Sequence, residues 1–187
     1  MRTIGRLAAP AALAVVAVLA LTGCGRGAAP DAGGAGDIPD NQAFVEYRPA
    51  GAKYSIKVPE GWSRSETGDT ATFTDKLNTI TVGLGARGTA PDVAAGQAEL
   101  ASLRDNAGFS AGPVTVEQRP AGPVLLIRYR ADADADPVTG KVVNDDVERY
   151  EYWHAPADML TVTLAGPHGA DNADPWRTVT ESVRWLG

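Results

Sequence analysis

The chain has little of the usual chemistry of catalytic sites. It contains one cysteine, Cys24, and only two histidines, His154 and His168, among its 187 residues. A single cysteine excludes an internal disulfide, and the two histidines do not form a His-Glu-x-x-His or other paired-ligand spacing. The sequence also lacks a Gly-x-Ser-x-Gly segment, which is the usual sign of a serine hydrolase. We therefore expect no metal, no cofactor and no catalytic residues.

Basic residues are also scarce, with 17 Lys and Arg against 23 Asp and Glu, a net charge of −6. The first 23 residues contain Arg2 and Arg6 and no acid, so without them the balance becomes 15 against 23, or −8. Such a chain lacks the basic patch that binds nucleic acid. It also lacks a broad electrostatic attraction to anionic lipid headgroups. We therefore expect no nucleic-acid partner.

The N-terminus has the order of an export signal. Arg2 and Arg6 precede an apolar run from Leu7 to Leu21, and small residues follow. The run is shorter than the roughly 20 residues that span a bilayer. A basic start, a short apolar segment and a small-residue exit predict a signal peptide. The alternative is a buried N-terminal core helix.

The segment Leu21-Thr22-Gly23-Cys24 resembles the lipobox of bacterial lipoproteins. The resemblance implies that the Cys24 thiol carries diacylglycerol and that cleavage occurs between Gly23 and Cys24. Two acyl chains are enough for stable membrane attachment. A free thiol or a small buried apolar residue are the alternatives, but Cys24 stands at the end of the export signal. We expect a lipid anchor on the extracytoplasmic face of the cell membrane.

The composition divides the chain into three parts. Residues 1–23 are the expected lipoprotein signal peptide. Residues 24–43 have almost no bulky apolar side chains and no periodicity, which predicts a lipidated N-terminus and a flexible tether. An arm that docks on the domain is the alternative for this segment. Residues 44–187 contain no second linker and are expected to form a single domain.

Period-two alternation predicts that this domain is built mainly of strands. The segment Val124–Arg130 begins apolar on both faces, which favours a central strand, and a hairpin is expected around Pro156-Ala157-Asp158. Because most connections are short, the sheet should be largely antiparallel. The other expected strands are 54–58, 70–74 and 79–84, and the hairpin strands are 147–154 and 159–165.

Two helices are expected. One begins with Thr89 as its cap and runs through Arg104, and the other begins at Asp174 with Pro175 at its first position. Each has one apolar stripe, so each should lie on the sheet. The prediction is an α+β fold with a largely antiparallel sheet of about seven to nine strands flanked by helices.

Two segments carry a family resemblance. The segment Tyr54–Trp62 (YSIKVPEGW) and the C-terminal segment Glu181–Trp185 (ESVRW) resemble the PsbP-like superfamily, including LpqN-type lipoproteins of actinobacteria. The abundance of Ala, Gly and Pro is typical of a GC-rich actinobacterial genome. The resemblance implies an α/β/α sandwich and a non-enzymatic accessory role in binding proteins or envelope lipids. The shared motif is structural, so it identifies no ligand-binding residue.

An acidic loop, Asp132-Ala-Asp134-Ala-Asp136, suggests calcium. An EF-hand loop requires Gly and Glu where this chain has Pro137 and Val143. We therefore interpret the segment as a solvated acidic loop, and a looser cation site stays open.

Two further polar groups have competing interpretations. The stretch Asp171–Arg177 is either a helix start capped by Asp174 or an exposed recognition edge. Tyr150, Tyr152 and His154 share one strand face, which is either core or a stacking surface for sugar or lipid.

These observations favour a membrane-anchored, extracytoplasmic lipoprotein that is not an enzyme. Its domain would bind an envelope lipid, glycan or protein. The alternative is an envelope hydrolase that uses paired carboxylates in a cleft. Two deeply buried, adjacent carboxylates in one cleft would favour that alternative.

Overall fold

The computed structural model describes residue 34 and residues 36–186. The expected signal peptide, Cys24 and residues 24–33 and 35 of the expected tether lie outside the described residues. No helix within the described part of the chain is long and apolar enough to cross a membrane.

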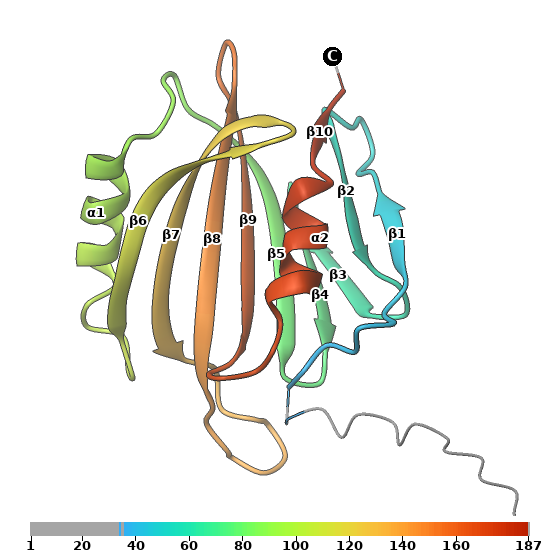
Figure 1. Ribbon diagram of the computed structural model, residues 1–187, viewed down its shortest axis with the longest axis vertical. Coiled ribbons are helices and arrows are strands. Elements are labelled where there is room, and N and C mark those ends of the chain that lie inside the picture. The colour runs from blue at the N-terminus through green and yellow to red at the C-terminus, as the bar shows by residue number, and fades with distance from the viewer. Residues whose placement is uncertain (1–33, 35, 187) are drawn as a thin grey trace, which may run out of the picture. The chain divides into compact units, whose positions relative to one another are not determined.

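Seven strands form the main sheet, in the order β3-β4-β5-β9-β8-β7-β6, and every neighbouring pair is antiparallel. Figure 1 shows this sheet running across the molecule. The strands are β3 (Ser63–Thr67), β4 (Thr70–Asp75), β5 (Asn78–Ala86), β6 (Ser110–Arg119), β7 (Gly122–Asp132), β8 (Asn144–His154) and β9 (Asp158–Pro167).

A second, three-stranded sheet has the order β1-β2-β10. Its strands are β1 (Phe44–Tyr47), β2 (Tyr54–Pro59) and β10 (Arg184–Trp185), and the helices are α1 (Val93–Ser102) and α2 (Ala173–Glu181). Helix α2 and the small sheet cover one face of the main sheet, and α1 lies by β6 and β7 (Figure 1). The predicted α+β class and the largely antiparallel sheet are confirmed. The main sheet has seven strands, within the expected seven to nine, and the three further strands of the described residues form the separate small sheet.

The larger hydrophobic core lies between the main sheet and the layer of α2 and β2. Alternate residues of β2, β4, β5, β7, β8 and β9 point into it, as period-two alternation requires. Tyr150 and Tyr152 are 2% and 1% exposed here, which confirms that they are core. His154, on the same strand face, is exposed and stacks on Trp185.

A smaller core lies beneath α1. Leu100 of this helix packs against Leu125 and Ile127 of β7. Because Val124 and Leu126 of the same strand face the larger core, β7 is apolar on both sides. This explains the predicted central strand at Val124–Arg130.

Both helices begin differently from the prediction. Asp92, not Thr89, caps α1, because its extended backbone lets its carboxylate accept the Ala95 N–H. The helix therefore begins at Val93 and ends before Arg104. Asn172 is the N-cap residue of α2, and Asp174 lies within the first turn.

The Pro-Glu-Gly-Trp turn has the expected structural role. Strand β2 ends at Pro59, Gly61 has a positive φ of 85°, and Trp62 packs against the larger core. At the other end of the chain, Val183 is completely buried and β10 pairs with β2.

Residues 36–43 of the expected tether contact the domain. Ile38 is 3% exposed and belongs to the larger core, and its N–H donates to Asn172 Oδ1 at 2.8 Å. These residues therefore have the docked arrangement that was the alternative to a free tether. We call residues 36–38 the arm.

Candidate binding pocket at the start of the second helix

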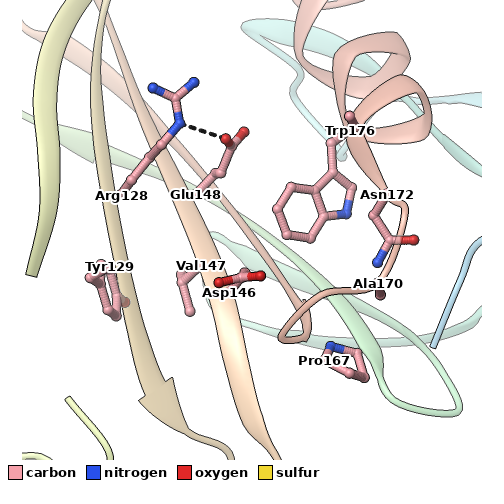
Figure 2. A pocket seen from close by; sticks show the side chains of 10 residues that line it. Arg128, Tyr129, Asp146, Val147, Glu148, Pro167, Ala170, Asn172 and Trp176 are labelled. Carbon is pink, nitrogen blue, oxygen red and sulfur yellow. Dashed lines mark hydrogen bonds and ion pairs between the residues drawn. The ribbon is translucent and has the colours of Figure 1, made fainter. Parts of the chain in front are cut away.

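A pocket of about 250 Å³ lies between the main sheet and the start of α2. Strands β7 and β8 form its floor, and the loop after β9 and the first turn of α2 form its wall (Figure 2). Its lining residues are Arg128, Tyr129, Asp146, Val147, Glu148, Pro167, Ala170, Asn172, Ala173 and Trp176.

An ion-pair group occupies one side of the pocket. Arg128 and Glu148 face each other in the register of β7 and β8, and Arg128 Nε donates to Glu148 Oε1 at 2.7 Å. Tyr150 Oη donates to the other oxygen of Glu148 at 2.6 Å. Burial, followed by the contact with Glu148, raises the pKa of Tyr150 well above its usual value, so this hydroxyl stays protonated. Both oxygens of Glu148 are thus engaged.

A second polar group lies at the pocket's edge. His168 Nδ1 lies 2.9 Å from Asp146 Oδ2, and the Gly169 N–H donates to the same oxygen at 3.1 Å. His168 Nε2 lies 3.2 Å from Arg130 Nη1. His168 therefore lies between Asp146 of β8 and Arg130 of β7, with a neighbour at each ring nitrogen.

Trp176 supplies the largest apolar part of the wall. It is 8% exposed and belongs to the larger core, as its helical stripe predicted. Its indole Nε1 is buried and has no hydrogen-bond partner among the described residues. Figure 2 shows the indole beside Asn172 and facing Glu148 across the pocket. An aromatic wall opposite paired charges suits a small ligand with apolar and polar sides.

Asp145 is buried and directly precedes Asp146, the residue of β8 that lines the pocket. Its side chain is 7% exposed, and Oδ1 has no hydrogen-bond partner among the described residues. Burial, with a smaller contribution from the charge of Asp146, raises the pKa of Asp145 to about 6.

The stretch Asp171–Arg177 has features of both predicted roles, the helix start and the recognition edge. Asp174 pairs with Arg177 at 2.8 Å on the exposed surface and does not cap the helix. The Asn172 side chain turns away from the helix N–H groups and holds the arm instead. Asn172 and Trp176 also line the pocket, so the stretch is both a helix start and the wall of a candidate site.

The other predicted polar residues do not gather at the pocket. Asp136 accepts hydrogen bonds from the backbone N–H groups of Val138 and Thr139, which lower its pKa, and it forms a turn. No group of three His, Cys, Asp or Glu residues in the described part of the chain could hold a metal ion. His154 lies at the other end of the β8–β9 hairpin from His168.

Among the described residues, the most deeply buried carboxylate lies on the opposite face of the sheet. Glu151, with a side chain 2% exposed, lies 3.4 Å from Arg149 and 3.8 Å from Arg87. Glu99 of α1 pairs with Arg149 at 2.8 Å, and burial raises the pKa of Glu99. Glu151 borders a cavity of about 60 Å³, but Glu99 does not. Through Arg149, these carboxylates link α1 to the sheet.

No protein-family model matches the chain, and no curated protein matches its sequence. Solved structures do share its fold. The solution structure of cyanobacterial PsbP from Synechocystis sp. PCC 6803 has a TM-score of 0.56 at 11% identity, covering 78% of this chain and 94% of that one. The Ran-binding protein Mog1p of Saccharomyces cerevisiae has a TM-score of 0.51 at 12% identity, covering 77% of this chain and 96% of that one. The fold is therefore PsbP-like, as the resemblance implied.

Proposed function

We propose that the chain is an extracytoplasmic lipoprotein, anchored by diacylglycerol on Cys24, whose domain is a binding module and not an enzyme. The lipobox and the export signal support the anchor. The pocket at the start of α2 supports binding, and it is the observation that carries this part of the proposal.

The chemistry of the pocket favours binding over catalysis. Both oxygens of Glu148 and both nitrogens of His168 are engaged by neighbouring side chains. A general acid or base must instead reach the proton that it transfers. The ion pairs hold the polar lining in one arrangement, which reduces the cost of ordering it around a ligand.

The fold is compatible with a binding role. The yeast neighbour is a Ran-binding protein, so this fold can carry a surface for another protein. We accordingly propose an envelope protein, glycan or lipid as the partner. The hydrolase alternative receives little support from Glu99 and Glu151, because both carboxylates pair with Arg149 and the small cavity that Glu151 borders is not lined by Glu99.

Native mass spectrometry of the protein extracted from its own envelope tests the binding role. We expect a bound molecule on the natural chain. Ala170→Trp should remove it by filling the pocket, and Ala94→Trp on the exposed face of α1 is the matched control. Repeatedly empty spectra together with no crosslinked partner would argue against a binding module.

The anchor is tested separately by metabolic labelling with a palmitate analogue. The natural chain should be labelled and remain with the membrane, and Cys24→Ala should lose the label and be released. Unchanged labelling of Cys24→Ala would contradict lipidation of this cysteine.

A further inference from the structure

The arm is fastened to the domain by hydrogen bonds at one place. Asn172 Oδ1 accepts the Ile38 N–H at 2.8 Å, and Asn172 Nδ2 donates to Gly36 O at 3.2 Å. Asn78 Nδ2 donates to the same Gly36 oxygen at 2.8 Å. The Asp171 N–H donates to Asp37 Oδ1 at 2.9 Å. Hydrogen bonds therefore hold both the backbone and a side chain of the arm on the domain.

Two glycines make this close approach feasible. A Cβ on Gly36 would lie 2.4 Å from Pro167 Cγ, and the φ of Gly36 is +96°. A Cβ on Gly166 would lie 2.4 Å from Asn78 Oδ1. Neither contact leaves room for a side chain, so the domain is shaped to receive the arm here. We call these contacts of Gly36, Asp37 and Ile38 with Asn78, Asp171 and Asn172 the clamp.

The clamp and the pocket share residues. Asn172 holds the arm and lines the pocket, and Pro167 contacts the arm and lines the pocket. The point where the chain leaves the domain toward Cys24 therefore lies beside the pocket. Eleven residues separate Cys24 from Gly36, and the twelve steps between the two Cα atoms span at most about 43 Å in any conformation.

The end of the domain opposite the pocket lies much farther from the clamp, at the other end of the main sheet. Strand β8 runs from Asn144 near the pocket to His154, where Trp185 stacks. These ten steps correspond to roughly 33 Å. To bring that end to the membrane, the connecting chain would have to run back along nearly the whole strand length, which costs conformational freedom.

We infer that the clamp orients the anchored domain so that the pocket end faces the bilayer surface. This inference rests on the proposed lipid anchor at Cys24. The pocket is then presented to molecules at the level of the lipid headgroups, and the end with His154 and Trp185 points away from the membrane.

The charge of the pocket end indicates how it meets the membrane. Asp171 is exposed beside the clamp, and the exposed Asp174 and Arg177 balance each other, so these residues offer no net positive charge to anionic lipids. The chain connection, and not adhesion, holds it near the bilayer. The pocket therefore stays accessible instead of being pressed onto headgroups.

Paramagnetic broadening of tryptophan indole N–H signals measures this orientation. The chain beginning at Cys24 is coupled through that thiol to a maleimide phospholipid in phosphatidylcholine nanodiscs that contain a nitroxide-headgroup lipid. Trp176 reports on the pocket end, and Trp153 and Trp185 report on the other end. We expect at least about twofold stronger broadening at Trp176. Equal broadening, or stronger broadening at Trp153 and Trp185, would overturn the inference.

Two insertions distinguish the effect of the short connection to the clamp from the effect of adhesion to the membrane. Twenty Gly and Ser residues placed between Ala29 and Pro30 should reduce the difference, because the longer connection lets the domain turn. The same insertion after Thr139, in the loop between β7 and β8, should leave the difference intact. A difference that survives the first insertion unchanged would also overturn the inference, since adhesion would then orient the domain.

This test is independent of natural lipidation. The synthetic coupling anchors Cys24 whether or not the cell does so, and the mass of the natural N-terminus reports on the proposed anchor. A failed orientation and a failed anchor therefore give different results.

Discussion

Asp145 shows how one buried side chain makes stability depend on pH. Its pKa rises from 3.8 to about 6 in the folded chain because burial disfavours the carboxylate. Between these values the folded state binds more protons than the unfolded state. The contribution of Asp145 is therefore most favourable below about pH 4 and is lost as the pH rises through about 6.

Asp145→Asn should remove this dependence. We expect the variant to gain about 2 kcal/mol at pH 7 relative to its change at pH 4, because no buried charge remains. Urea unfolding of both chains at several pH values measures the difference. Asp134→Asn in the exposed loop removes the same charge and should show no such trend. A parallel trend in both variants would contradict a specific effect of burial.

Gly36 provides a second test at the residue scale. Gly36→Ala combines backbone strain with the contact to Pro167 and should cost about 2–3 kcal/mol in the free energy of unfolding. Gly51 also has a positive φ, +69°, but no atom lies within 4 Å of its Cβ position. Gly51→Ala should therefore cost only about 1 kcal/mol. Equal losses measured by urea unfolding would show that the clamp contributes nothing.

At the scale of elements, periodicity predicted most strands and the existence of both helices. It placed the hairpin of β8 and β9 correctly, because apolar and polar residues alternate on both sides of Pro156. It misplaced the start of α1, since Thr89 and Asp92 are both good capping residues. Only the backbone conformation at Asp92 decides between them.

The pocket could not be predicted in the same way. The alternation in β7 and β8 shows that Arg128 and Glu148 each point to a definite face, but not that they are opposite each other. That pairing depends on the register between β7 and β8, which the connecting loop of residues 133–143 helps to determine. The docked arm was only the alternative prediction, because Ile38 is a single apolar residue in a polar segment and its burial arises from tertiary contacts.

Helix α1 offers a test of packing between elements. Gly96 lies against β6 and β7, and a Cβ there would be 2.7 Å from Val114 Cγ1 and 3.1 Å from Leu125 Cδ2. Gly96→Val should push the helix from the sheet and cost about 1–3 kcal/mol. Ala98→Val on the exposed side of the helix should cost only the helix preference of valine, about 0.5 kcal/mol. Thermal unfolding of both variants compares the two costs, and equal losses would refute close packing at Gly96.

At the scale of the whole molecule, the proposal separates two tasks along the chain. The N-terminal segment would determine where the protein resides, and the domain of two sheets and two helices would bind. The clamp connects these tasks, because the arm meets the domain at the pocket wall. The acidic balance of the chain makes a lipid anchor more important, since electrostatic attraction to anionic membranes is weak.

The mass of the N-terminal peptide of the protein extracted from its own membrane tests the lipid anchor most directly. We predict that the peptide begins at Cys24 and carries a diacylglyceryl group on the thiol. A peptide that begins at another residue, or that begins at Cys24 with a free thiol, would contradict the proposed lipoprotein.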